Sequence, residues 1–224
     1  MDAAAPEQRF LGQIGRSNVV VLGYFPGAET IVHLLGALAF YDPRLKYFAL
    51  ASLLRLGQAV EANDIAAVAV SSEMRNELYR KLEQLHKLDL YPAAYRTQAA
   101  FAESDMVNWL SYPTELARVP DEIQLGKSIT VETEGGELIY YVFRFRSDSS
   151  HWAAEKGWMA GVSGPFIASA PPGHHSLGET FSTLDPWESK TPEEHLGNIQ
   201  NIMERWREYR KTREALATNN GTLP

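Results

Sequence analysis

Residues 128–146 have the sequence SITVETEGGELIYYVFRFR. The two central glycines can adopt the positive φ angles of a tight turn, so this stretch predicts a β-hairpin with strands over Ser128–Thr133 and Leu138–Arg146. In the second strand, alternate positions form one apolar face: Ile139, Tyr141, Phe143 and Phe145. Because successive side chains of a strand point to opposite faces, we expect that face to be buried, and Arg144 and Arg146 to reach solvent or carboxylates.

The chain after the hairpin predicts more strand and then a helix. A third strand is expected over Gly157–Phe166, followed by a polar loop, Ser169–Lys190, which contains prolines and glycines. The sequence TPEE that starts at Thr191 is typical of a capping box, in which the Thr191 hydroxyl and the Glu194 carboxylate each bind the other's backbone amide. We therefore expect a final helix that runs from this point to about Leu216.

The first half of the chain has the periodicity of helices. Between Ala28 and Leu110, turn signals separate segments whose apolar residues recur with a period close to 3.6. Asp42 precedes a proline at the first helical position, and Gly57 can end the same helix. Further helix starts or breaks are expected at Asn63-Asp64, Ser71-Ser72, Tyr91-Pro92 and Ser104.

One helical segment carries a resemblance to a known family. The sequence DPRLKYFALASLLRLG of residues 42–57 resembles the second half of a HEAT-type repeat, in which an aspartate opens the helix, small alanines allow close packing and a Leu-x-x-Leu-Gly ends it. It departs from that pattern at Lys46, where the family usually has arginine. The blocks Trp109–Leu116 and Pro120–Ile123 are similar to bacterial proteins described only as HEAT-repeat-containing. The resemblance implies a binding scaffold rather than a chemical reaction.

Repeat architecture adds a constraint on the fold. A single repeat cannot bury its own apolar face, and this chain has room for about two repeats before its pattern changes. We therefore predict an α+β chain with short antiparallel HEAT-like helical hairpins over residues 1–112. A small antiparallel sheet and a C-terminal helix follow over residues 113–224, and the sheet caps the last helices. Whether the two regions share one continuous core is left open.

Composition excludes several classes of protein. The chain has 224 residues, a formal net charge of −7 and no cysteine. The absence of cysteine excludes a disulfide scaffold, a thiolate metal site and a cysteine nucleophile. The acidic balance argues against broad nucleic-acid binding, because phosphate neutralisation needs a basic surface. The first residues do not resemble a signal peptide, and no apolar stretch reaches the roughly 18–20 residues that span a bilayer. We expect a cytoplasmic protein.

Two stretches could carry catalytic or metal chemistry. The sequence GVSGP around Ser163 is similar to a nucleophile elbow, but Pro165 stands where that motif needs glycine and the following residues favour an extended chain. His174 and His175 are adjacent on a loop and have no third ligand at helical spacing, so a metal site would need distant histidines to join them. We predict neither a catalytic residue nor a metal site. The acidic residues near the hairpin are predicted to be solvated charges: Asp121, Glu122, Glu132, Glu134 and Glu137.

A cationic run stands out on the predicted final helix. Within nine residues it contains five basic residues: Arg205, Arg207, Arg210, Lys211 and Arg213. One interpretation is a solvated helix face whose cations lie favourably near the helix C-terminus. The other is a dock for an acidic partner.

The leading functional hypothesis is a non-enzymatic protein-binding module with no cofactor, bound to another protein whose identity is open. Toxin neutralisation of the immunity-protein type is a narrower form of it, since an acidic protein is steered onto a basic target. The alternatives are a hydrolase that uses the Ser163/His174/His175 region and a structural domain of a larger assembly. The oligomeric state is also open.

Overall fold

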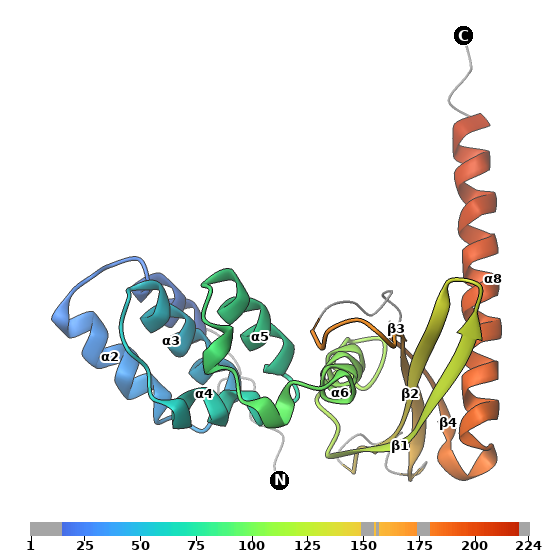
Figure 1. Cartoon of the computed structure of the whole chain (residues 1–224), viewed down its shortest axis with the longest axis horizontal. Helices are drawn as coiled ribbons and strands as arrows, with labels where there is room; N and C mark the ends of the chain where they lie inside the picture. The colour runs from blue at the N-terminus through green and yellow to red at the C-terminus, as the bar shows by residue number, and fades with distance from the viewer. Residues whose placement is uncertain (1–14, 149–154, 156, 174–179, 220–224) are drawn as a thin grey trace.

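The computed structural model describes residues 15–148, 155, 157–173 and 180–219. Residues 15–22 are helical, and the later helices of the first half are α2 (Ala28–Leu38), α3 (Pro43–Arg55), α4 (Ala62–Ala69), α5 (Arg75–Gln84) and α6 (Gln98–Leu110). Short 3₁₀ turns lie between α5 and α6 at Leu88–Leu90 and Ala93–Tyr95. The second half contains β1 (Glu122–Thr133), β2 (Gly136–Arg146), β3 (Met159–Ile167), β4 (Thr180–Pro186), a 3₁₀ turn at Trp187–Ser189 and α8 (Pro192–Asn219). The α+β class is confirmed (Figure 1).

The α3 helix begins and ends as its sequence predicts. Asp42 Oδ1 accepts hydrogen bonds from the backbone amides of Arg44 (2.8 Å) and Leu45 (3.3 Å), and proline occupies the first helical position. At the other end Gly57 has a φ of +73°, and the Gln58 amide donates to a carbonyl one turn back. This Schellman arrangement satisfies carbonyls that the helix end would otherwise leave unpaired.

Two predicted helix starts are wrong. The α4 helix begins at Ala62, before Asn63, and has no side-chain cap. Ser104 lies inside α6, whose cap is Thr97: the Thr97 hydroxyl accepts from the Ala100 amide at 3.2 Å. The Ser104 hydroxyl accepts instead from the amide of Asn76 in the first turn of α5, at 3.4 Å. Ser104 therefore serves the beginning of a neighbouring helix, which local sequence does not reveal.

A buried arginine ties three helices of the first half together. Arg75 donates to the carbonyl oxygens of Ala69 and Val70 at the end of α4, and to the carbonyl of Ala100 in α6, at 3.0, 3.3 and 2.9 Å. Glu103 lies 3.4 Å from the same guanidinium. Because the helix dipole makes the end of α4 electronegative, this is a favourable place for a buried cation.

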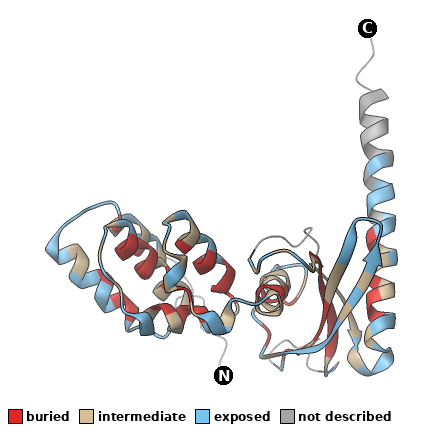
Figure 2. Cartoon of the chain, in the orientation of Figure 1, coloured by how far each residue is buried: buried red, intermediate tan, exposed pale blue. Residues whose placement is uncertain are grey.

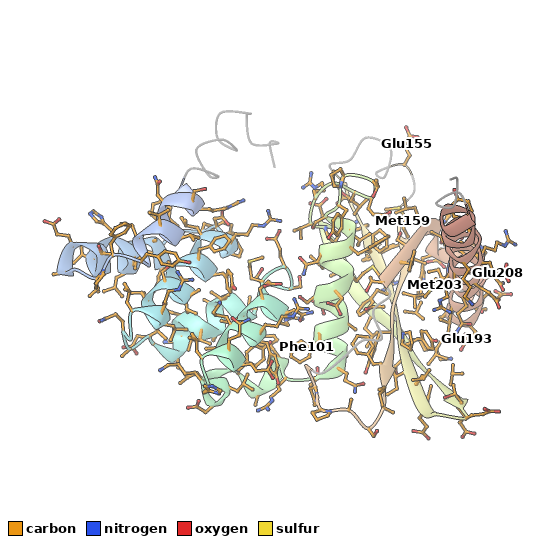
Figure 3. The ribbon with its side chains drawn as sticks, turned by 90° about the horizontal axis from the view of Figure 1, so that it is seen from above. Phe101, Glu155, Met159, Glu193, Met203 and Glu208 are labelled. Carbon is orange, nitrogen blue, oxygen red and sulfur yellow. The ribbon has the colours of Figure 1, made fainter. Side chains whose placement is uncertain are left out.

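The sheet is the middle of three layers. Its described strands are antiparallel and follow the order β1-β2-β3-β4, with α6 on one face and α8 on the other (Figure 1). Figure 3 shows these layers from above, with Met159 of β3 and Met203 of α8 labelled. The α6 side buries the predicted apolar face of β2: Tyr141, Phe143 and Phe145, with Ile139 partly buried. The α8 side buries the alternate position Val142, so both faces of β2 are covered.

Of the two β2 arginines, Arg146 meets a carboxylate as predicted, whereas half-buried Arg144 meets an amide oxygen and an aromatic ring. Arg146 pairs with Glu122 of β1. Arg144 donates to the Gln124 side chain at 2.7 Å, and its guanidinium lies 4.7 Å from the centre of the Trp158 ring.

The capping box at the start of α8 is confirmed. The Glu194 amide donates to the Thr191 hydroxyl (3.3 Å), and the Thr191 amide donates to the Glu194 carboxylate (2.8 Å).

The predicted loop Ser169–Lys190 contains a strand that the sequence did not reveal. Residues of β4 pair with β3 at Gly161↔Ser182 and Ser163↔Thr180. Phe181 and Trp187 pack into the cluster under α8. The strand is short and carries serine, threonine, aspartate and proline, which give no clean apolar alternation.

The two halves meet at α6. Phe101 belongs to the core of the first helices, whereas Ala102, Met106 and Leu110 belong to the core between α6 and the sheet. Figure 2 shows buried residues on both sides of this helix. The sheet therefore covers the last helix of the first half.

Candidate binding surfaces

Ser163 is enclosed in the sheet. It lies in β3, is fully buried, and its hydroxyl is 3.1 Å from the Thr180 hydroxyl on β4. A hydroxyl in this position is not presented to a substrate. His174 and His175 lie outside the described residues, and within those residues no cluster of three or more histidine, aspartate or glutamate side chains could hold a metal ion. His195 is buried on α8, with Nε2 3.0 Å from the Trp187 carbonyl oxygen.

The acidic residues of the hairpin are not gathered at one place. Glu132, Glu134 and Glu137 are exposed near its turn. Glu122 is at the opposite end of β1, next to Asp121, which accepts a hydrogen bond from the Asp148 amide at 2.8 Å. An acid–base pair would need carboxylates within about 5–9.5 Å of each other, so these two groups do not form one site.

The cationic run lies on the part of α8 that extends past the sheet (Figure 1). The first turns of α8 pack on the sheet through Leu196, Ile199 and Met203. Beyond them Arg205, Arg207 and Lys211 are exposed, as are the neighbouring Glu204 and Glu208. The side chains of Arg210 and Arg213 lie outside the described residues.

Exposed apolar side chains gather on the first helices. Among the described residues, the exposed large hydrophobic and aromatic side chains include seven from residues 21–41: Val21, Tyr24, Phe25, Val32, Leu35, Phe40 and Tyr41. Tyr41 is 92% exposed and Val32 is 67% exposed. Such a concentration is typical of an interaction surface rather than of scattered surface residues.

Two of these residues, Val32 and Phe40, line a groove that we call the α2 groove. Val32 and Gly36 line it from one face of α2, because residues four apart lie above one another on a helix, and Phe40 lines it from the turn after α2. Val19 and Leu22 line it from the helix 15–22. The groove has a volume of about 660 Å³, and its lining is mostly apolar.

A second cavity, the junction pocket, lies between α5 and α6 and has a volume of about 420 Å³. Its residues come from α5, α6, β3 and the turn after β3: Asn76, Tyr79, Arg80, Glu83 and Gln84 on α5, Gln98, Phe101 and Asp105 on α6, Phe166 on β3, and Gly173. Asn76 Nδ2 donates to Asp105 Oδ1 at 2.8 Å. Burial raises the pKa of the Asp105 carboxyl, although the Asn76 hydrogen bond and the Arg80 charge act in the opposite direction.

Neither the groove nor the pocket was singled out from the sequence. The helical spacing of Val32, Gly36 and Phe40 was available as a signal, but a buried α2 would have the same pattern. In the same way, Asn76, Arg80 and Glu83 are polar at helical spacing, which is also typical of a solvated face. Whether such a face is buried, solvated or lines a groove depends on what each helix packs against.

Comparison with known proteins finds no family model, no curated protein and no solved structure that matches this chain. The similarity of residues 42–57 to HEAT-type repeats therefore stays a prediction. Among the described residues, no helix has the length and apolar character needed to cross a membrane.

Proposed function

We propose that this chain is a non-enzymatic protein-binding module that docks a partner on the exposed face of its first helices. The observation that carries the proposal is the α2 groove with its mostly apolar lining, which includes the exposed side chains of Val32 and Phe40. Burial of such a surface is favourable by roughly 25 cal/mol per Å² before the costs of association. The occupant is a partner helix with an apolar face, because helix-in-groove docking reads anchors at this spacing.

Gly36 supports a close approach from outside the chain. Glycine inside a helix costs about 1 kcal/mol relative to alanine. Within the described residues, a Cβ atom at Gly36 would meet no atom within 4 Å outside the backbone of its own helix, so the packing of those residues does not require glycine at that position. A partner that lies directly against the α2 backbone explains why this position has no side chain.

The cationic run of α8 supplies a second contact in this proposal. Its exposed cations lie on a helix that extends past the sheet, where an acidic segment of the partner can reach them (Figure 1). Exposed charges of this kind mainly raise the rate of association and set specificity. A cytoplasmic location, and toxin neutralisation as the biological role, are narrower forms of the same proposal.

Site-specific photo-cross-linking in the native host tests the proposal. A photoreactive residue replaces Tyr41 beside the α2 groove, or Val70, which is 60% exposed and lies at the end of α4. We expect one protein to be cross-linked from position 41 and not from position 70. Gly36→Gln should abolish this cross-link while it stabilises the isolated chain, since glutamine is a far better helix former than glycine. Arg205→Glu combined with Lys211→Glu should weaken it.

Gly197→Gln is the matched control. Gly197 is also a helical glycine whose Cβ would meet no described atom within 4 Å outside its own helix backbone, but it lies on α8. This variant should gain stability and keep the cross-link. An unchanged cross-link in Gly36→Gln, or the same set of proteins from positions 41 and 70, would contradict the proposal. Concentration-dependent self-association through position 41 would identify a second copy of the chain as the occupant instead.

A further inference from the structure

The β1 strand is one edge of the sheet. Among the described strands, β1 pairs with β2 on one side and with no strand on the other. It has 12 residues, most of them exposed, whereas a typical strand has about five or six. In Figure 1 no described helix lies over the hairpin of β1 and β2. An edge strand of this length presents a row of backbone N–H and C=O groups with which another strand can pair.

The backbone groups that point outward belong to three residues in the second half of β1: Ser128, Thr130 and Glu132. The residue of β2 opposite Glu132 is Glu137, whose carbonyl accepts from the Ala168 amide at 2.9 Å and therefore points to β3, away from β1. In an antiparallel pair, residues that exchange backbone hydrogen bonds alternate with residues that do not. Since the register with β2 is regular over this half of β1, Thr130 and Ser128 also turn their backbone groups outward.

The features that commonly protect an edge strand are confined to the first half of β1. The register with β2 shifts between Leu125 and Lys127, which is a bulge. Lys127 pairs with Glu193 of α8, so its charge is held against its own chain. From Ser128 to Thr133 the strand has neither a bulge nor a proline, and its isoleucine, threonines and valine favour strand pairing. This half of β1 can therefore accept a further strand.

The same segment is complementary to a second copy of itself. Antiparallel pairing of two copies about Thr130 places the two Thr130 residues opposite each other, and Ser128 of each copy opposite Glu132 of the other. All three outward-pointing residues of each copy then exchange backbone hydrogen bonds. On the other face, half-buried Ile129 lies opposite Val131. No carboxylate lies opposite another carboxylate across this interface, which matters for a chain of net charge −7.

We propose that the second half of β1 is a self-association surface, at which two copies of the chain pair antiparallel about Thr130 and form one continuous sheet. The occupant is a second copy because the segment is complementary to itself in backbone groups, side chains and charge. Pairing about Ile129 or about Val131 places one of the three outward-pointing residues opposite the bulge or the turn of the other copy. This surface is separate from the α2 groove and from the cationic run of α8.

Disulfide trapping of single-cysteine variants tests both the partner and the register, because the chain contains no cysteine. Thr130→Cys places two thiols directly opposite each other, where the Cα atoms are about 5.5 Å apart and a disulfide can form. Ser128→Cys and Glu132→Cys should each give no disulfide-linked dimer alone, since identical positions are offset by four residues, a distance of roughly 14 Å. An equimolar mixture of these two variants should give the linked heterodimer, which its mass identifies.

Thr130→Pro tests the backbone pairing. The outward N–H of Thr130 does not donate to β2, so proline removes a hydrogen bond to the other copy and leaves the bonds between β1 and β2 in place. In sedimentation equilibrium, we expect the wild-type chain to approach twice its mass of 25.0 kDa as its concentration rises, and the variant to stay at 25.0 kDa. Circular dichroism shows whether the variant is folded.

Val32→Lys alters the α2 groove and should leave self-association unchanged, so this proposal can fail while the proposed function stands. A wild-type chain that stays at 25.0 kDa at every concentration would overturn the proposal. So would a folded Thr130→Pro that still dimerises, or Thr130→Cys linked no faster than Ser128→Cys. Disulfides from Thr130→Cys to a different protein of the host, without the homodimer, would replace the second copy by a foreign strand and also overturn it.

Discussion

Asp105 illustrates how one buried carboxyl couples stability to pH. Burial on α6 removes water from its ionised form and raises its pKa above the ordinary value of 3.8. The hydrogen bond from Asn76 and the charge of Arg80 favour ionisation but do not outweigh burial. The pKa of Asp42 is shifted the other way: its own burial would raise it, but Arg16 and the capping amides hold it below 3.8.

These shifts predict opposite pH effects for two Asp→Asn variants. Between pH 3.8 and the raised pKa, the folded protein keeps the Asp105 proton whereas the unfolded chain has lost it. The free energy of unfolding of the wild type therefore falls as pH rises through this window. Asp105→Asn should therefore gain stability near neutral pH and gain nothing below the window. Each unit of pKa shift corresponds to about 1.4 kcal/mol. Urea unfolding curves across the acid range measure the effect.

Asp42→Asn is the control of opposite sign. The depressed pKa of Asp42 means that its ionised form stabilises the fold above pH 3.8. Its replacement should therefore cost stability near neutral pH, and the cost should fade as pH falls through the lowered pKa. A gain for Asp105→Asn that is independent of pH would contradict the assignment of that gain to a desolvated carboxylate.

The α8 helix depends on its first turn, because it is anchored on one side only and its later turns extend past the sheet (Figure 1). The Thr191 hydroxyl and the Glu194 carboxylate satisfy two backbone amides there. Lys127 of β1 pairs with Glu193 in the same turn and ties the start of the helix to the edge of the sheet.

Thr191→Ala should lower the free energy of unfolding by about 0.5–2 kcal/mol, because it leaves a capped amide without its side-chain acceptor. Denaturant unfolding followed by far-UV circular dichroism measures this loss. Thr114→Ala, an exposed threonine in the turn after α6, should change stability by less than about 0.5 kcal/mol. A Thr191→Ala midpoint equal to that of the wild type would show that the cap contributes nothing to the fold.

The α6 helix decides whether the molecule unfolds as one unit. Its residues belong to the core of the first helices and to the core under the sheet. Gln98 and Tyr79 add hydrogen bonds from the helices to the last residue of β3 and to the chain that follows it. A loss of packing in the core of the first helices should therefore also lower the stability of the sheet.

This coupling has a direct spectroscopic test, because all five tryptophans lie at or after Trp109. Leu53 is fully buried in the core of the first helices, so Leu53→Ala should cost about 2–5 kcal/mol. We expect the denaturation midpoint measured by tryptophan fluorescence to fall together with the midpoint measured by circular dichroism. An unchanged fluorescence midpoint would mean that the sheet and the first helices unfold independently.

Much of the fold could be predicted because its signals are local. The Asp42 cap, the Gly57 helix end, the hairpin at Gly135-Gly136 and the Thr191 capping box each need only a few neighbouring residues. The buried face of β2 followed from strict alternation over one strand. In each case short-range sterics and hydrogen bonds select one conformation, so the residue pattern itself determined the outcome.

Other features were decided only by tertiary structure. Ser104 caps α5 across a separation of 28 residues, and β4 is a strand because β3 offers it an edge and α8 covers Phe181. The α2 groove and the junction pocket exist because of what each helix does, or does not, pack against. Helical spacing shows which residues share a face, but only contacts between distant segments show whether that face is buried, solvated or open to a partner.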